Sequence, residues 1–501
     1  MIHDLEALYT KQPPEKRAFI DGAYVSAKDG AVMQKVNSFS GFDLSGIAAC
    51  SQADVDYAVA CAKRAYEEGT WRNRPVDGKK AVILAIADLM EENKKELAQL
   101  DTIETCRCFR DYYEDSIPKA IEAVRYFAEA SDKLYDKSIS GRKNACGIVK
   151  RVPLGVVGVI TPWNDPMVVT MWKVIPALLM GNSVVLKPAE QSSLSAIYWA
   201  GLAKKAGIPD GVVSVVPGYG ETAGKALALH QDVRGIFFTG SSEVGKKLCT
   251  YAGMSNMKKI GLECGGKGPY IVTGRCKNIQ LAARTLAESM FYNQGQICSA
   301  PSRVIVETGV KDAFLACLKE EGKKFVPHHP YDTESRVGCM VSREQFDKVQ
   351  GYMTYAREKG FTVYQEERDP QMPVQACCIA PVIITDVPPN DRLAREEIFG
   401  PVVVVLEADS VSEAVRIAND SEYGLAGAVW TDDINEAYEV AEQVEVGLMH
   451  INSYGEDDNA APFGGVKQSG LGKDKSVYAF DEYSDLKTIW VKFRPEEEQE
   501  Q

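Results

Sequence analysis

The segment from Asn293 to Ser299 holds the residue types best suited to chemistry in this chain. It places Cys298 among amide side chains, a glycine and a small hydroxyl, directly after an expected helix over Leu281 to Tyr292. A thiol on flexible backbone, with amide donors beside it, can reach a substrate as a nucleophile and have its adduct stabilised. The alternative is that Cys298 is a buried structural thiol, as free cysteines often are.

Two other residues carry groups that would complete such chemistry. Glu263 precedes Cys298 by 35 residues and is followed by Gly265 and Gly266. The glycines predict that its carboxylate is displayed on a turn, where it could take a proton from a water. Asn164 follows a strand-like run and offers an amide donor. The plainer interpretations are that Glu263 caps a turn and that Asn164 forms an Asx turn.

A second group of residues is suited to holding a dinucleotide. Lys187 and Glu190 follow a strand-like run, and the carboxyl ends of parallel strands are where such sheets bind ligands. Glu190 could accept from a ribose 2′-OH and disfavour a 2′-phosphate, which favours NAD while leaving NADP possible. Gly240 and Ser241 lead into a helix whose N-terminus suits a pyrophosphate, and Gly220 permits close backbone approach. The usual G-x-G-x-x-G order is absent, and solvated loops remain the alternative.

The elements that must position these residues alternate between short apolar strands and helices. Strands are expected over 152–160, 183–186, 212–216 and 235–238, and helices over 168–180, 194–206, 222–229 and 243–252. This alternation predicts a parallel α/β sheet, and it resumes between residues 267 and 448 as a second α/β domain.

The flanking segments have a different character. Residues 51–132 have helical periodicity, and residues 1–50 are expected to be irregular, with a hairpin from Phe19 to Val25. The alternating strand from Asp485 to Lys492 has no nearby partner in sequence. It is therefore expected to pair with another subunit.

Composition excludes several classes of protein. The 501 residues predict two or three domains, and a net charge of -13 argues against nucleic acid as a partner. No apolar run is long enough to span a membrane, and the N-terminus lacks the features of a signal peptide. Thirteen irregularly spaced cysteines and five histidines form neither a disulfide framework nor a metal site. A soluble, reduced, cytoplasmic protein is expected.

Two further motifs, Glu396 to Val402 and Pro462 to Gly470, complete a pattern that resembles the aldehyde dehydrogenase superfamily from about Phe19 to Trp490. The chain most resembles bacterial amino-aldehyde dehydrogenases of the γ-glutamyl-γ-aminobutyraldehyde, guanidinobutyraldehyde and betaine aldehyde types. The resemblance implies an α/β fold with two doubly wound domains and a small β oligomerisation extension. The implied boundaries are 1–132 and 153–264 for the NAD-binding domain, 265–460 for the catalytic domain, and 133–152 and 480–495 for the extension. It also implies a homo-oligomer, a dimer or a tetramer.

The same resemblance assigns roles to the candidate residues. Cys298 would be the nucleophile, Glu263 the general base and Asn164 an oxyanion donor, acting with the backbone N–H of Cys298. The reaction would be NAD(P)-dependent oxidation of an aldehyde to an acid through a thiohemiacetal and a thioester, with no metal. The implied cofactor-binding residues are Thr161, Trp163, Lys187, Glu190, Gly220, Gly240, Ser241, Gly245, Glu397 and Phe399.

Departures from the family pattern bear on the substrate. By resemblance the substrate tunnel is lined by Asp165, Trp172, Ile297, Ser299, Tyr454, Asp457 and Phe463. Carboxylates at Asp165 and in the loop Glu456 to Asp458 would attract a cation, and Trp172 and Tyr454 could face an ammonium group. These features predict a cationic amino-aldehyde, as in polyamine catabolism. Alternatives are that the acids face bulk water, that the aldehyde is neutral and aliphatic or aromatic, that the enzyme acylates coenzyme A, or that the chain is not catalytic. The helical region around Thr105 to Arg107 also lacks the Gly-Lys-Pro that is usual there.

Overall fold

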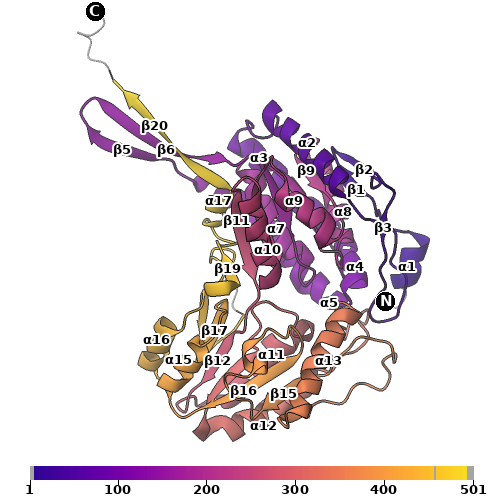
Figure 1. The fold of residues 1–501 in the computed structure, drawn as a ribbon, viewed down its shortest axis with the longest axis vertical. Coiled ribbons are helices and arrows are strands. Elements are labelled where there is room, and N and C mark those ends of the chain that lie inside the picture. The colour runs from indigo at the N-terminus through magenta and orange to yellow at the C-terminus, as the bar shows by residue number, and fades with distance from the viewer. Residues whose placement is uncertain (1–4, 456–457, 494–501) are drawn as a thin grey trace, which may run out of the picture.

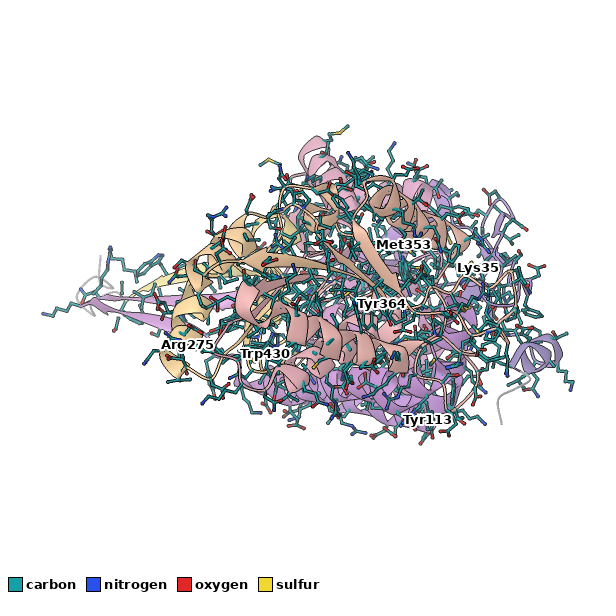
Figure 2. All side chains as sticks on the ribbon, turned by 90° about the horizontal axis from the view of Figure 1, so that it is seen from below. Lys35, Tyr113, Arg275, Met353, Tyr364 and Trp430 are labelled. Carbon is teal, nitrogen blue, oxygen red and sulfur yellow. A yellow bond between two sulfur atoms is a disulfide. The ribbon has the colours of Figure 1, made fainter. Side chains whose placement is uncertain are left out.

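The computed structural model describes residues 5–455 and 458–493 and confirms the α/β fold. Two large sheets, each covered by helices, form the body of the molecule, and a narrow three-stranded arm projects from it (Figure 1). Side chains fill the space between the layers, while the arm stands clear at one end (Figure 2).

The first sheet has eight strands in the order β19-β11-β10-β7-β8-β9-β1-β2. Its parallel core consists of β7 (Val156–Ile160), β8 (Ser183–Lys187), β9 (Val213–Val215), β10 (Val233–Gly240) and β11 (Lys259–Cys264). The chain order reverses between β7 and β10, so the sheet is doubly wound and its switch point lies where such sheets bind ligands. The expected hairpin is confirmed as β1 (Ala18–Ile20) and β2 (Ala23–Val25), and β19 (Gly470–Leu471) adds an antiparallel edge.

Helices cover both faces of this sheet. Their bounds are α2 (Gln52–Glu68), α9 (Lys225–Leu229) and α10 (Ser242–Met254) on one face, and α3 (Val76–Glu92), α4 (Lys94–Thr105), α6 (Ile117–Ala130), α7 (Pro166–Leu179) and α8 (Leu194–Ala206) on the other. The helical repeat read from the sequence explains α2, because Val55, Ala58, Val59 and Ala62 are all fully buried on one side.

The second sheet has seven strands in the order β14-β15-β16-β13-β12-β17-β18. Its bounds are β12 (Pro269–Val272), β13 (Arg303–Glu307), β14 (Thr362–Gln365), β15 (Val382–Thr385), β16 (Val402–Ala408), β17 (Ala426–Trp430) and β18 (Leu448–Ile451). The main helices here are α11 (Ile279–Phe291), α12 (Lys311–Gly322), α13 (Arg343–Glu358), α15 (Val411–Asn419) and α16 (Ile434–Gln443). The valine- and isoleucine-rich strands are buried on both faces, as parallel sheets require.

Short elements connect these layers. They are α1 (Leu5–Lys11), β3 (Val32–Met33), β4 (Ile47–Ala48), α5 (Phe109–Asp111), the π-helical turn Tyr112–Ser116, the turns Ser131–Lys133 and Gly220–Gly224, the turn Tyr292–Gly295, the turns Thr308–Val310 and Lys323–Phe325, α14 (Arg392–Arg395), the turn Lys467–Ser469 and α17 (Ala479–Glu482). The expectation that residues 1–50 are irregular was therefore wrong for α1, β3 and β4.

The arm corrects one expectation. It consists of β5 (Lys137–Arg142), β6 (Ala145–Pro153) and β20 (Ser484–Lys492). The last strand pairs along one edge with β6 of the same chain, and it is the edge strand of this sheet, so pairing of its other edge with another subunit stays a prediction. The strand expected over 152–160 is two strands, because the chain turns at Gly155, whose φ of 127° lies in the region that favours glycine.

The cysteines also depart from expectation at one place. Cys339 and Cys378 form a disulfide across 39 residues, so the fully reduced state that was expected is wrong for this pair. Within residues 5–455 and 458–493, no helix is long and apolar enough to cross a membrane. In the same ranges, no group of three or more His, Cys, Asp or Glu residues is arranged to hold a metal ion.

Candidate functional site

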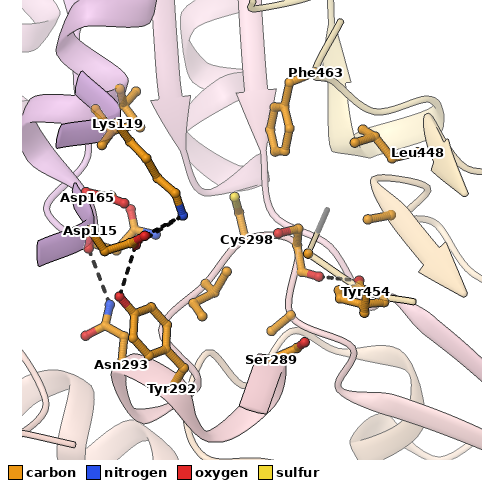
Figure 3. Close-up of a pocket in the computed structure, with 18 of the residues that line it drawn as sticks. Asp115, Lys119, Asp165, Ser289, Tyr292, Asn293, Cys298, Leu448, Tyr454 and Phe463 are labelled. Atoms are coloured by element: carbon orange, nitrogen blue, oxygen red, sulfur yellow. Dashed lines mark hydrogen bonds and ion pairs between the residues drawn. The ribbon is translucent and has the colours of Figure 1, made fainter. Parts of the chain in front are cut away.

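A cavity of about 360 Å³ is lined by residues from both sheets and contains the candidate nucleophile (Figure 3). Cys298, Glu263 and Asn164 all line it. The sulfur of Cys298 points into the middle of the cavity, with Asp165 to one side and Tyr454 to the other. The structure thus brings together three residues that lie on segments far apart in the sequence.

The segment after α11 is braced by its amide side chains. Gln294 donates to the carbonyl of Ile379 at 2.6 Å and accepts from its N–H at 3.1 Å. Gln296 accepts from the N–H of Val341 at 3.0 Å. These two amides therefore fix the backbone that carries Cys298, and the expectation that they stabilise its adduct was wrong.

The surroundings of the Cys298 sulfur favour the thiol over the thiolate. Burial raises its pKa to about 12, and the nearby carboxylates of Glu397 and Glu263 raise it as well. The backbone N–H groups of Ser299 and of Cys298 itself act in the opposite direction. These N–H groups are donors beside the sulfur, where an oxyanion formed on an adduct would lie.

Glu263 lies inside β11 and is buried, so the expectation that a turn displays it was wrong. Burial raises its pKa well above the usual value, and the charge of Asp474 raises it further. Asp474 is ion-paired with Lys173 at 2.7 Å, with both side chains buried. Gly464 leaves room for the Glu263 carboxylate, since a Cβ there would lie 2.5 Å from Oε1. The carboxyl group is thus enclosed beside the thiol and disposed to hold a proton.

Asn164 lies on the loop that follows β7, at the carboxyl edge of the first sheet. Its Nδ2 donates to the backbone carbonyl of Gln296 at 3.1 Å. An amide nitrogen carries two hydrogens, so this bond leaves donor capacity on the cavity side. The same bond ties Asn164 to the segment that carries Cys298.

Arg107, which the sequence did not identify as a site residue, lines the cavity and is buried. It follows α4, where Cys106 adopts a left-handed φ of 59° and ends the helix. Its guanidinium lies 3.5 Å from Asp165 and 3.7 Å from Asp111. Burial raises the pKa of Asp165 and the charge of Arg107 opposes this rise. Asp165 is therefore half of an ion pair, and the expectation of a free anionic wall was wrong there.

The aromatic residues expected on the tunnel wall, Trp172, Tyr454 and Phe463, all line the cavity. The rings of Trp172 and Phe463 pack together with their centroids 5.4 Å apart, and Nζ of Lys475 lies 5.3 Å from the centroid of the Trp172 ring. Lys475 is buried and is not among the residues that line the cavity, so this contact leaves open whether the Trp172 ring faces a substrate ammonium group. Tyr454 donates to the carbonyl of Ser299 at 2.5 Å, which holds its ring against the cavity.

The other tunnel residues fall into two groups. Ile297 and Ser299 line the cavity. Asp457 and its neighbour Glu456 lie outside the described residues. Asp458 is exposed and accepts from the N–H of Ala460 at 2.7 Å, so it caps a turn.

The candidate cofactor residues gather at the carboxyl edge of the first sheet. Lys187 Nζ pairs with Glu190 Oε2 at 2.8 Å at the end of β8. Ser241 caps α10 by accepting from the N–H of Val244 at 3.3 Å, and because α10 directly follows β10 its N-terminus lies at this edge. Thr161 and Gly240 end their strands beside them, and Gly220 begins an exposed turn with nothing within 4 Å of a Cβ position. Gly245 instead packs on the sheet, where a Cβ would lie 2.9 Å from the sulfur of Cys264.

Glu397 and Phe399 reach the site from the second sheet. Glu397 Oε1 accepts from the N–H of Gly266 at 3.1 Å. Burial raises its pKa to about 7. Phe399 adopts a φ of 57° and meets Trp163 edge to face, with ring centroids 5.4 Å apart. A carboxyl group and an aromatic edge therefore adjoin the thiol on the side of the candidate cofactor residues.

Arg107, Lys173 and Asp474 were not identified as site residues from the sequence. Signals for two of them were present. The segment Thr105 to Arg107 departs from the family pattern, and Lys173 is a lone charge within the otherwise apolar helix α7. Asp474 follows a glycine-rich segment and no local sequence pattern indicates its role.

Comparisons with known proteins bear on this site. A model of the family described as "Aldehyde dehydrogenase family" matches residues 24–489. The chain is 43% identical over 477 residues to the NADP/NAD-dependent aldehyde dehydrogenase PuuC of Escherichia coli, which covers 95% of this chain and 96% of that protein. A structure of an indole-3-acetaldehyde dehydrogenase with NAD+ matches with a TM-score of 0.95 and 42% identity, over 98% of this chain and 99% of that one. A structure of γ-glutamyl-γ-aminobutyraldehyde dehydrogenase from Burkholderia cenocepacia matches with a TM-score of 0.94 and 42% identity, over 98% of this chain and 100% of that one.

Proposed function

Because the chain belongs to the aldehyde dehydrogenase family and performs NAD-dependent aldehyde oxidation, we propose that Cys298 is its nucleophile, with Glu263 as general base and Asn164 as oxyanion donor. The observation that carries this proposal is that these three side chains line one cavity. The test is Cys298→Ser, which should abolish production of the acid from every aldehyde.

The chain's own groups account for the covalent steps. Cys298 adds to the aldehyde carbon as its thiol proton passes to solvent, and the resulting oxyanion is held by the amide of Asn164 and the N–H of Cys298. Donors of this kind each lower a barrier by about 3 kcal/mol. When bound, NAD supplies the acceptor for the hydride that leaves this carbon. Glu263 then takes a proton from a water that attacks the thioester, which releases the acid and the thiol.

The surroundings of Glu263 suit it to this task. A general base works best when its pKa lies near the working pH. Burial and the charge of Asp474 raise the pKa of Glu263, while Lys173 and Lys473 limit the rise. A carboxyl in such a setting takes up a proton far more readily than an exposed one.

The cofactor residues fit an adenine dinucleotide. The N-terminus of α10 with Ser241 suits the pyrophosphate, and Lys187 with Glu190 suits the adenosine ribose. The carboxylate of Glu190 would lie against a 2′-phosphate, so we propose that NAD is preferred over NADP. Glu397 and Phe399 would hold the nicotinamide end.

The substrate we propose is an amino-aldehyde. Each of three carboxylates on the cavity wall has a cation of the chain as its partner: Asp165 pairs with Arg107, Asp115 with Lys119 and Glu288 with Arg284. A substrate ammonium group could share these carboxylates with their partners. The name of the similar Burkholderia cenocepacia structure points the same way. Turnover of 4-aminobutyraldehyde and succinic semialdehyde, followed by absorbance of the reduced cofactor, tests the proposal. Preference for the anionic aldehyde would contradict it.

A neutral aromatic aldehyde is a second candidate. The cavity walls include the rings of Trp172, Tyr454 and Phe463, and a similar structure is an indole-3-acetaldehyde dehydrogenase. Adding indole-3-acetaldehyde to the same assay separates the two candidates. Hydrolysis is favoured over transfer to coenzyme A by the presence of Glu263, and a product assay with and without coenzyme A tests this. A chain without catalytic activity would turn over none of these aldehydes.

The remaining expectations belong to the proposal. The arm leaves Leu486 and Trp490 exposed on its last strand, which supports a homo-oligomer, a dimer or tetramer, formed through it. The amino-aldehyde name of a similar structure supports a place in polyamine catabolism. A cytoplasmic location is proposed with it.

A further inference from the structure

A buried guanidinium joins the two loops that carry the candidate catalytic residues. We propose that Arg107 is a positioning and specificity-determining residue, which aligns the Asn164 loop with the Cys298 segment and cancels the charge of Asp165 on the tunnel wall. The inference rests on the proposed roles of Cys298 and Asn164. Arg107 and Asp165 both stand where the chain departs from its family pattern, and the structure shows that they are partners.

The positioning role follows from where the guanidinium donates. One terminal nitrogen of Arg107 lies 3.4 Å from the carbonyl of Asn164, and the other donates to the hydroxyl of Tyr292. The carbonyl of Asn164 also accepts from Nδ2 of Asn293 at 3.3 Å. Tyr292 and Asn293 begin the segment that leads to Cys298. Arg107 therefore holds the backbone of the oxyanion donor and the start of the nucleophile segment with one rigid, planar group.

The guanidinium itself is held in place from several sides. Its centre lies 4.9 Å from the ring centroid of Tyr112 and 4.8 Å from that of Tyr292. The carboxylate of Asp111, four residues later in the chain, lies 3.7 Å from the guanidinium. A group packed between two rings and two carboxylates has little freedom to leave. This rigidity suits a residue that sets the spacing of two loops.

The specificity role follows from charge. Asp165 lines the cavity, and its carboxylate lies 3.5 Å from Arg107. At this distance the ion pair presents a dipole to the tunnel instead of a net negative charge. Removing the carboxylate of Asp165 makes the charge of this wall more positive by one unit, and removing the cation of Arg107 makes it more negative by one unit, while Asp111 is unchanged in both cases. The two single changes must therefore shift the preference for charged ligands in opposite directions.

Three variants separate the two roles. Asp165→Asn removes the negative charge and keeps the guanidinium. Arg107→Met removes both the positive charge and the hydrogen bonds that join the two loops. Arg107→Lys keeps the positive charge without the planar group that can donate to both loops. Arg125→Met is the matched control, because Arg125 forms an exposed pair with Asp88 at 2.9 Å and lies away from the cavity lining.

The charge role is measured by alkylation of Cys298, which needs no turnover. Iodoacetate and iodoacetamide differ by one negative charge, and peptide mass spectrometry gives the rate at each cysteine. The ratio of the iodoacetate rate to the iodoacetamide rate should rise about threefold or more in Asp165→Asn and fall by a similar factor in Arg107→Met. It should stay unchanged in Arg107→Lys and Arg125→Met. Exposed Cys249 provides an internal reference whose ratio should not move in any variant.

The positioning role is measured by turnover of a neutral aldehyde. Arg107→Lys should lower kcat by about tenfold or more with little change in KM, because an ammonium cannot span both loops and small misplacements are costly. Wild-type kcat in Arg107→Lys would overturn the positioning role. An unchanged alkylation ratio in both Asp165→Asn and Arg107→Met would overturn the specificity role. If the wild-type protein oxidises no aldehyde, the proposed function fails, and the alkylation ratios still decide whether Arg107 sets the charge of the tunnel.

Discussion

Replacing Glu263 by glutamine should separate the two halves of the reaction. The amide has the shape of the carboxyl group and cannot accept a proton, so hydrolysis of the thioester should be the step that suffers. Loss of a general base costs about 10²- to 10⁴-fold in rate. Asp474 lines the same cavity, but its ion pair with Lys173 at 2.7 Å makes it a poor substitute. We therefore expect a fall in steady-state kcat of a hundredfold or more, which corresponds to about 2.7 kcal/mol of barrier.

The first turnover should survive in the same variant. The charge of Glu263 is one of the causes that raise the pKa of Cys298, so its removal lowers that pKa and does not hinder the attack on the aldehyde. Stopped-flow absorbance should show a burst of about one reduced cofactor per active site, followed by slow steady turnover. Glu482→Gln is the matched control, since this carboxylate lies outside the cavity lining. Loss of the burst together with kcat would refute the assignment and place Glu263 in the attack step.

The pH profile provides an independent check of the same assignment. The charge of Asp474 raises the pKa of Glu263, and Lys173 lowers it. Because the base must be deprotonated to act, the acid limb of kcat should move to lower pH in Asp474→Asn and to higher pH in Lys173→Met. If the acid limb moved in the same direction in both variants, or did not move in either, Glu263 would not be the group that titrates.

Three further outcomes are expected. Cys298→Ser should retain cofactor binding in a calorimetric titration and lose turnover of every aldehyde, and residual turnover would mean that another group is the nucleophile. Glu190→Gln should raise the ratio of kcat/KM for NADP to that for NAD by about tenfold, because the charge that opposes a 2′-phosphate is removed while Lys187 remains; an unchanged ratio would place the ribose elsewhere. Changing both Leu486 and Trp490 to Asp should lower the mass measured by light scattering without loss of secondary structure, and an unchanged mass would exclude the arm as the assembly surface.

The sequence predicted well those features that depend on neighbours in the chain. Lys187 and Glu190 were placed by a local rule, that polar residues after a buried parallel strand meet at one sheet edge, and the structure joins them at 2.8 Å. The rule needs only the strand, and β8 lies where its apolar run predicted it. The same reasoning located the loop of Asn164 after β7.

Features that depend on distant partners were beyond such rules. Asp165 was interpreted as an anionic wall because its partner Arg107 lies on another element, and no local pattern announces an ion pair between them. The partner that the strand from Asp485 to Lys492 has within its own chain was missed for the same reason, because β6 lies more than 300 residues earlier in the chain. Charge and pairing are properties of the folded neighbourhood, so a single sequence gives the residue types and leaves the partners open.

Glu263 was identified as a site residue for a structural reason that was wrong, and the glycines that follow it have a different role. They were interpreted as the turn that displays this carboxyl group, and the structure places Glu263 inside a strand instead. What the glycines allow is close approach from two sides. A Cβ at Gly265 would lie 2.1 Å from Glu397, and a Cβ at Gly266 would lie 2.9 Å from the carbonyl of Cys298. The carboxyl group of Glu397 and the backbone of Cys298 thus both pack against the backbone of these two adjacent glycines. A side chain at Gly265 would displace Glu397, and a side chain at Gly266 would displace Cys298.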